Sequence, residues 1–210
     1  AEEGRQAHGI LLDLGLNSAA LDDSGRGFRH SDPAAPLDMR MDRNRPGTAA
    51  DLLNETSEEE LARIFHDLGE ARRPRAAARA IVRARAARPL LTSGDLVQAL
   101  ERARAVPGGP AELSRIFQAI RLEVNHELDE IDRFISGVAD WLVPGGRLVV
   151  IAYESLSDRR VKSLQRNSVD TGEEARFRKL TAHVLRPDRD EIRDNPRARS
   201  AKLRVMERKD

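Results

Sequence analysis

The segment His8-Gly9-Ile10-Leu11-Leu12-Asp13-Leu14-Gly15 is a short apolar run that ends at an acid and a glycine. Such a run is typical of a strand that is buried on both faces of a parallel sheet. Ligands of open α/β sheets bind outside the carboxyl ends of the strands, which is where Asp13 stands. We therefore expect an α/β fold in which the strand Gly9–Leu14 delivers Asp13 to a ligand site. The alternative is a plain strand-to-loop turn in which Asp13 caps local N–H groups.

The rest of the chain predicts a core that is interrupted by an insertion. The string RLVVIAY, residues 147–153, follows a Pro-Gly-Gly turn and predicts a second strand, and two weaker strands are expected at 179–185 and 201–205. Roughly 130 residues separate the first two strands, which is far more than a parallel crossover needs. A module is therefore inserted between them.

The inserted module is predicted to be helical. Ser57 and Glu60 form the pattern of a capping box, and an apolar stripe that ends at Leu68 follows. An alanine- and arginine-rich helix is expected from Arg72 to Arg88, and the string Thr92 to Asp95 introduces another. The predicted parts are a first core segment at 1–56, the insertion at 57–106 and a second core segment at 107–210.

The composition argues against several classes of function. Because cysteine is absent from the sequence, it offers no disulfide framework, thiolate metal site or cysteine nucleophile. The five histidines lack zinc-ligand spacing, and no G-x-S-x-G or P-loop pattern occurs, so no metal site is expected. No apolar run approaches the roughly 20 residues that span a bilayer, so we expect no membrane contact. The absence of cysteine allows a reducing compartment, and we expect a cytoplasmic location.

The loop from Gly25 to Asp42 is a candidate binding segment. It is dense in glycine, arginine and acids, and ordered loops of this length are often functional. Phe28 could stack on a base, Arg26 and Arg40 could hold phosphates, and Asp38 could accept a hydrogen bond from an amine. The alternative is a mobile surface loop with ordinary ion pairs.

Two further charged segments stand out. The arginines between Arg72 and Arg88, Arg79 and Arg83 among them, recur at spacings that can place guanidinium groups on one helical face and so track a phosphate backbone. The alternative is a solvated face paired with acids. Glu154 and Asp158 follow the second predicted strand, but the sequence does not show that they face each other, so no acid–base role is assigned.

Six strings, taken in order, resemble the bacterial 16S rRNA (cytosine-N4)-methyltransferase family: LLDLGLNS, RGF, PLDMRMD, FQAIRLEVNHELDEI, PGGRLVVIAYESLSDRRVK and NPRARSAKLRVMER. The resemblance covers nearly the whole chain. It implies a class I, Rossmann-like methyltransferase that uses S-adenosylmethionine, with a helical insertion that helps to hold RNA. The implied partner is 16S rRNA in the small ribosomal subunit, and the implied reaction is direct methyl transfer to the exocyclic N4 of a cytidine in the decoding region.

The resemblance also implies roles for individual residues. Asp13, with Gly15 beside it, matches the family's contact to S-adenosylmethionine. Asp38 and Arg40 lie in the segment that resembles the cytidine side of the cleft, and they are the candidate catalytic residues. The expected RNA-binding residues are Arg26, Phe28, Arg79, Arg83 and Arg159.

The sequence also departs from the family pattern. The family's glycine-rich loop and acidic ribose-binding position lie upstream of LLDLG, whereas this sequence begins only a few residues before that strand. Ala20 stands where the family has a glutamine that touches the cofactor, and Glu154 stands where it has a histidine. We therefore expect a partial methyltransferase sheet with weak or no binding of S-adenosylmethionine.

Two alternatives and one open question remain at this stage. The chain could be a non-catalytic rRNA-binding or ribosome-assembly protein on a degenerate methyltransferase scaffold. It could instead be an incomplete product that folds poorly, because an unpaired edge strand exposes core surface. The sequence leaves open whether the protein forms a homodimer.

Overall fold

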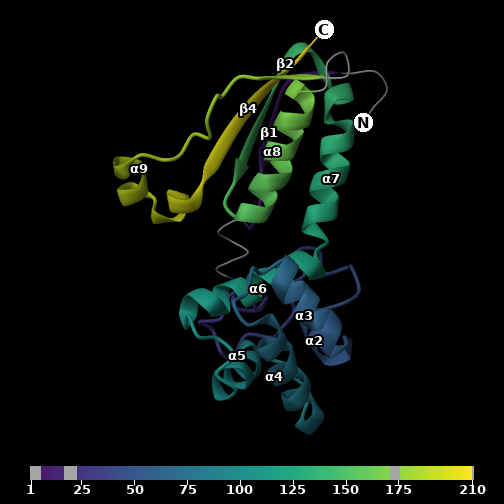
Figure 1. Ribbon diagram of the computed structural model, residues 1–210, viewed down its shortest axis with the longest axis vertical. Coiled ribbons are helices and arrows are strands. Elements are labelled where there is room, and N and C mark those ends of the chain that lie inside the picture. The colour runs from purple at the N-terminus through teal and green to yellow at the C-terminus, as the bar shows by residue number, and fades with distance from the viewer. Residues whose placement is uncertain (1–5, 17–22, 171–175, 210) are drawn as a thin grey trace. The chain divides into compact units, whose positions relative to one another are not determined.

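The computed structural model describes residues 6–16, 23–170 and 176–209, and Figure 1 shows their course. The chain forms two compact units. Residues 1–15 and 128–210 make the first, here called the sheet unit, and residues 16–127 make the second, the helical unit. The expected insertion at 57–106 lies wholly inside the helical unit, whose residue range extends beyond the insertion at both ends. None of the described helices is long and apolar enough to cross a membrane.

The sheet unit contains a mixed sheet. Its four described strands are β1 (Ala7–Asp13), β2 (Leu142–Ala152), β3 (Phe177–Lys179) and β4 (Lys202–Arg208). Their order is β1-β2-β4-β3, with β1 parallel to β2 and β4 antiparallel to both of its neighbours. Strands and helices in this arrangement confirm the expected α/β class, and they fit a class I methyltransferase-like fold.

Strand β1 confirms the predicted strand but not its burial. Ile10 and Leu12 pack against the core of the sheet unit, whereas Leu11 points to the other face and is 67% exposed. The expectation of a strand buried on both faces was wrong, because β1 is an edge strand of the described sheet with one covered face. The strand expected at 179–185 was also wrong in extent, since Leu185 makes only an isolated bridge to Leu203.

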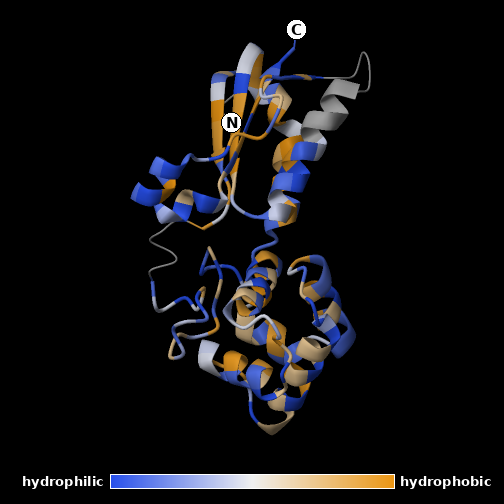
Figure 2. Cartoon of the chain, turned by 60° about the vertical axis from the view of Figure 1, so that its left-hand side comes forward, coloured by the Kyte–Doolittle hydropathy of each residue, from blue (hydrophilic) through white to orange (hydrophobic). Residues whose placement is uncertain are grey.

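Helix α8 (Ser155–Asp170) packs against the sheet, and an ion pair joins the two. Val161 of α8 lies in the same buried cluster as Leu148 and Met206 from the strands, whose apolar residues are orange in Figure 2. Arg204 on β4 is only 7% exposed, and its Nε lies 2.8 Å from Asp158 Oδ1 on α8, so the buried charge is compensated. The other helical segments are α7 (Glu127–Gly137), η1 (Val138–Trp141), α9 (Arg189–Asp194) and η3 (Pro196–Ser200).

The helical unit packs its described helices around an apolar core. Thr48, Ser57 and Thr92 each accept a backbone N–H at a helix start, and Pro74 and Pro110 open two other helices. These capping groups fix where the chain turns into helix. The helices are α2 (Ala49–Glu55), α3 (Glu58–Asp67), α4 (Pro74–Ala87), α5 (Ser93–Arg102) and α6 (Pro110–Val124).

Helix α3 starts where the sequence predicts, but its cap differs. Ser57 accepts the N–H of Glu60 at 3.2 Å, whereas the Glu60 carboxylate pairs with Arg63, whose Nε lies 2.8 Å away. The apolar stripe of α3 is buried, as expected, and it joins side chains from the other four helices. The largest fully buried members of this core are Leu37, Met39, Leu53, Leu61, Ile64, Phe65, Ile81, Leu96, Leu100, Ile116 and Ile120.

Candidate functional site

In the sheet unit, the carboxyl ends of the parallel strands β1 and β2 lie at one edge. Asp13 is in register with Ile151, and the N–H of Leu14 donates to the Ile151 carbonyl at 2.9 Å. Tyr153 follows β2, and burial together with the charge and hydrogen bond of Asp13 raises the pKa of its phenol. Gly15 turns the chain away with a φ of 112°, a conformation that favours glycine. The two strand ends therefore bring Asp13 and Tyr153 together.

The acids beyond β2 are already engaged. Glu154 caps the first turn of α8, because its carboxylate accepts the backbone N–H of Ser157 at 3.0 Å and also the hydroxyl of Ser157. Asp158 lies 2.8 Å from Arg204 and 3.7 Å from Lys202. The two acids thus hold α8 and β4 in place instead of forming a free pair. Arg159 is an exposed residue that follows the first turn of α8.

In the helical unit, the segment from Pro36 to Asp42, here called the PLDMRMD loop, alternates inward and outward. Leu37 and Met39 are buried in the core, at 1% and 0% exposure. The Asp38 and Leu37 carbonyls accept the first N–H groups of α2, from Ala49 and Ala50, both at 2.8 Å. The loop is therefore anchored by its apolar residues and by a helix start, which leaves Asp38 and Arg40 only partly buried.

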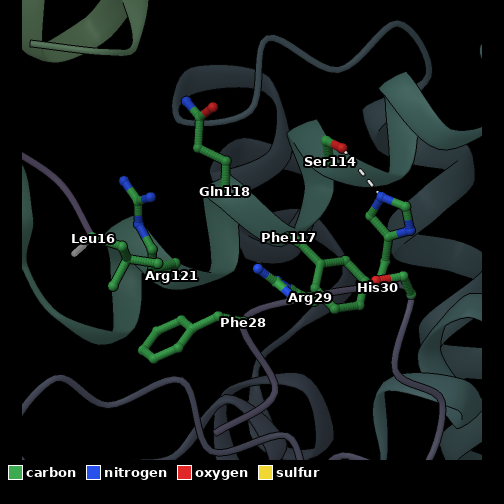
Figure 3. Close-up of a pocket in the computed structure, with 9 residues that line it drawn as sticks. Leu16, Phe28, Arg29, His30, Ser114, Phe117, Gln118 and Arg121 are labelled. Atoms are coloured by element: carbon green, nitrogen blue, oxygen red, sulfur yellow. Dashed lines mark hydrogen bonds between the residues drawn. The ribbon is translucent and has the colours of Figure 1, made fainter. Parts of the chain in front are cut away.

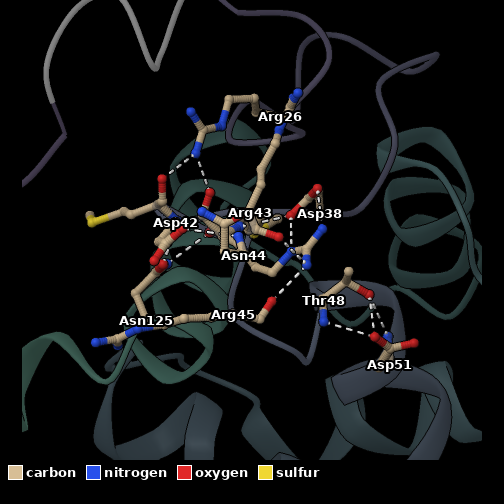
Figure 4. Close-up of polar contacts among 12 residues, drawn as sticks. Arg26, Asp38, Asp42, Arg43, Asn44, Arg45, Thr48, Asp51 and Asn125 are labelled. Atoms are coloured by element: carbon tan, nitrogen blue, oxygen red, sulfur yellow. Dashed lines mark hydrogen bonds and ion pairs between the residues drawn. The ribbon is translucent and has the colours of Figure 1, made fainter.

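Asp38, labelled in Figure 4, forms a bidentate ion pair with Arg40. Arg40 Nε donates to Asp38 Oδ1 at 2.7 Å, Nη2 donates to Oδ2 at 3.0 Å, and the Arg40 backbone N–H donates to Oδ1 at 3.1 Å. Arg40 Nη1 also reaches the carbonyls of Arg43 and Arg45, at 3.0 and 2.7 Å. The hydrogen bond from Arg40 lowers the pKa of Asp38, so this carboxylate is ionised at neutral pH.

The side chain of Arg26 binds the backbone of this loop. Its guanidinium donates to the carbonyl oxygens of Arg40 and Met41, the latter at 2.8 Å, and lies 5.4 Å from the ring centre of Phe28. Phe28 is only 9% exposed and belongs to the apolar core. These contacts favour a supporting role for both residues, and their binding of RNA stays a prediction.

Asn125, just after α6, is a loop-holding residue that the sequence reasoning missed. Its Nδ2 donates to the carbonyl of Met39 at 2.7 Å and to that of Arg121 at 2.8 Å, and its Oδ1 accepts the N–H of Met41 at 2.6 Å. Met39 between these contacts has a φ of 55°, the left-handed region that non-glycine residues rarely adopt. The available signal was an asparagine in the string EVNHEL, at the end of an amphipathic helix.

A pocket of about 360 Å³ opens beside Phe28 in the helical unit, shown in Figure 3. Phe117 and the imidazole of His30 meet edge to face in its wall, with ring centres 5.8 Å apart. The Ser114 hydroxyl donates to the Pro110 carbonyl at 3.0 Å and lies 3.2 Å from His30 Nε2. Aromatic rings with a few fixed polar groups suit a planar ligand that forms hydrogen bonds. The lining is Leu16, Phe28, Arg29, His30, Ser31, Ser114, Phe117, Gln118 and Arg121.

The arginines of α4 have different partners. Arg79 lies 3.3 Å from Glu58, Arg85 donates to the carbonyl of Leu53 at 2.7 Å, and Arg88 pairs with Asp95. Arg83 is exposed and has no hydrogen-bond or ion-pair partner among the described residues. Ala20, together with Asn17 and Ser18, lies outside the described residues. Within the described ranges no group of histidine and acidic side chains could hold a metal ion.

Comparison with known proteins gives a consistent picture. The model of the MraW methylase family matches residues 1–209. The chain is 45% identical over 202 residues to ribosomal RNA small subunit methyltransferase H of Elusimicrobium minutum, covering 96% of the chain and 68% of that relative. The same-named protein of Cyanothece sp. is 47% identical, with 96% and 66% covered, and that of Mycolicibacterium paratuberculosis is 46% identical, with 95% and 55% covered. The chain therefore spans between about half and two thirds of the length of these relatives.

The turn before the loop yields a stability prediction. Gly27 has a φ of 70°, and a Cβ there would lie 2.1 Å from the Pro36 carbonyl oxygen, whereas Gly47 has a φ of 82° and open space around it. Both alanine variants carry the left-handed penalty of about 1–2 kcal/mol, but only Gly27→Ala must also displace Pro36. We expect Gly27→Ala to lower the free energy of unfolding by about 2 kcal/mol more than Gly47→Ala. Urea denaturation measures both, and equal losses would contradict the tight turn.

The Asp38–Arg40 pair yields a pH prediction. The pKa of Asp38 is lowered from 3.8, so the pair contributes stability above the unfolded pKa and loses it as pH falls through the folded pKa. We expect Asp38→Asn to be less stable than wild type near neutral pH, with the difference vanishing in acid. Carbon-detected NMR of the Asp38 carboxyl should give a midpoint below 3.8. A midpoint at or above that value would rule out the ion pair.

Proposed function

The chain belongs to the MraW methylase family, a family of methyltransferases, and we propose that it serves S-adenosylmethionine-dependent methylation of the exocyclic N4 of a cytidine in 16S rRNA. The names of its relatives support ribosomal RNA of the small subunit as the substrate class. The observation that carries the proposal is the PLDMRMD loop, in which the bidentate pair with Arg40 fixes Asp38 as an ionised acceptor. The same unit contains the pocket beside Phe28, which suits a planar ligand.

The sheet unit offers a place that fits the cofactor. Asp13 is exposed at the carboxyl end of a parallel strand, where its carboxylate can accept hydrogen bonds from ligand hydroxyl or amino groups. The neutral Tyr153 hydroxyl donates to this carboxylate and so orients it. S-adenosylmethionine, when bound, supplies an electrophilic methyl group. Asp13 and Gly15 are therefore the proposed cofactor contacts, while Tyr153 is a positioning residue.

For the cytidine, the site must accept hydrogen bonds from the exocyclic amino group. The N4 lone pair is delocalised into the ring, so the site must orient the amino group and stabilise the positive charge that develops on it. An ionised carboxylate has about four acceptor positions, and Arg40 occupies three of those of Asp38. The position that is left, on Oδ2, can accept one N–H of the cytidine amino group.

The low pKa of Asp38 decides which role it can play. A carboxylate whose pKa is pushed below its usual value is a weak base, so Asp38 stabilises charge as an acceptor while the released proton passes to water. Arg40 holds the carboxylate in one orientation through its two side-chain hydrogen bonds. The proposed catalytic residue is thus Asp38, with Arg40 as its positioning partner.

The proposal is tested by assaying methyl transfer with the protein that is translated from the complete reading frame of its gene. Small-subunit particles that lack the modification are incubated with labelled S-adenosylmethionine, and nucleosides are separated by mass spectrometry. We expect N4-methylcytidine from the wild type. Asp38→Asn should lower kcat by at least about tenfold with little change in the KM for particles, because it weakens charge stabilisation. Asp13→Asn should instead raise the KM for the cofactor.

The control keeps the strand and its charge environment. His8→Gln changes another exposed side chain on β1 and should leave both constants as in the wild type. Methyl groups found on a base carbon or a ribose oxygen would overturn the N4 assignment. Binding of particles without any methyl incorporation by the wild type would favour the non-catalytic rRNA-binding alternative.

A further inference from the structure

Helix α4 is flanked by two grooves of opposite charge. The groove toward α3, of about 570 Å³, is lined by three acids against two arginines and a histidine. The groove toward α5, of about 410 Å³, is lined by three arginines against one acid. The charged and polar lining toward α3 is Glu58, Glu59, Arg63, His66, Asp67 and Arg75, and toward α5 it is Arg83, Arg88, Asp95, Gln98 and Arg102.

Ion pairs sharpen this contrast. On the α5 side, Arg88 and Asp95 lie 2.5 Å apart and neutralise each other. Arg83 on α4 and Arg102 at the end of α5 are both exposed, and neither has an ion-pair or hydrogen-bond partner among the described residues. Two uncompensated cations therefore face one groove from its two walls. On the other side of α4, Arg79 pairs with Glu58 at 3.3 Å.

Small side chains make up much of the lining of the α4–α5 groove. Alanines from both helices line it, so an extended ligand can approach the helix surfaces closely between the two cations. At physiological ionic strength the screening length is about 8 Å, so a ligand here responds to the groove's own charges and little to the net charge of +1. The alanines are Ala80, Ala84, Ala87, Ala99 and Ala103.

We propose that the α4–α5 groove binds the phosphate backbone of RNA, with Arg83 and Arg102 as the phosphate ligands. This proposal rests on the proposed function in one respect, which is that the polyanion bound in the groove is RNA. Arg102 is new to the RNA-binding set, and Gln98 lies between the cations, where its amide can reach a ribose or phosphate oxygen. Arg79 does not line the α4–α5 groove, and it pairs with Glu58 on α3 instead.

Fluorescence anisotropy with a labelled RNA hairpin of small-subunit sequence tests the groove. The double variant Arg83→Gln/Arg102→Gln should raise Kd about tenfold, which corresponds to the loss of two exposed ion pairs that salt screens. It should also reduce the slope of log K against log salt by about 2, or about 1 per phosphate contact. The matched control, Arg63→Gln/Arg75→Gln, removes the same charge from the groove toward α3 and should change Kd by less than about twofold.

A gain-of-function variant guards against misfolding as the cause. Gln98→Arg adds a cation to the groove and should tighten binding about threefold while steepening the salt slope by about 1. Equal losses in the two double variants would overturn the proposal, because affinity would then follow net charge alone. Unchanged binding in Arg83→Gln/Arg102→Gln would overturn it as well.

The same preparations separate this proposal from the catalytic one. If the wild type binds RNA with the expected salt response but forms no N4-methylcytidine, the proposed groove stands and the proposed methyl transfer is wrong. If Arg83→Gln/Arg102→Gln transfers methyl groups with an unchanged KM for particles, the proposed function stands and the proposed RNA-binding groove is wrong.

Discussion

The carbonyl oxygens and N–H groups of the turn from Met39 to Met41 need partners, and the candidate site depends on how they are satisfied. Buried backbone groups without partners are costly, and Met39 in addition adopts the left-handed conformation. Asn125 and Arg26 supply the partners, the first through its carboxamide and the second through its guanidinium. With the turn fixed, Asp38 and Arg40 can meet as a bidentate pair that is only partly buried.

This arrangement links the loop to the rest of the helical unit in both directions. The loop carbonyls accept the first N–H groups of α2, so the helix start and the loop stabilise each other. Leu37 and Met39 then carry the loop into the same core that α3 and α6 share. The acceptor at Asp38 is thus part of a packed element, and little conformational entropy is left to lose when a ligand binds there.

The sequence predicts those features that short-range patterns encode. Strands β1 and β2, the α3 stripe and the start of α3 at Ser57 follow from periodicity and from local capping residues, which act within a turn or two of the chain. The inward roles of Arg26 and Phe28 could not be predicted in this way, because their partners lie on other segments. Asn125 reaches Met41 across 84 residues, a contact that no local pattern reports.

The arginine run of α4 shows the same limit of prediction from local sequence. The spacing of arginines on α4 predicts a basic face, but whether each guanidinium is available depends on acids from neighbouring helices. Glu58 on α3 engages Arg79, whereas the α5 wall leaves Arg83 open and adds Arg102. In β1, likewise, the apolar run predicts the strand, while the exposure of Leu11 depends on which neighbours cover it.

Amide hydrogen exchange at Met41 in the ligand-free protein tests most directly whether the site is built in advance by its own chain. A preformed loop predicts that this N–H, bonded to Asn125 Oδ1 at 2.6 Å, exchanges slowly in the wild type. In Asn125→Ala it should exchange freely while the α3 amides stay slow. Exchange of the Met41 amide at the rate of an unstructured chain in the wild type would contradict a preformed loop.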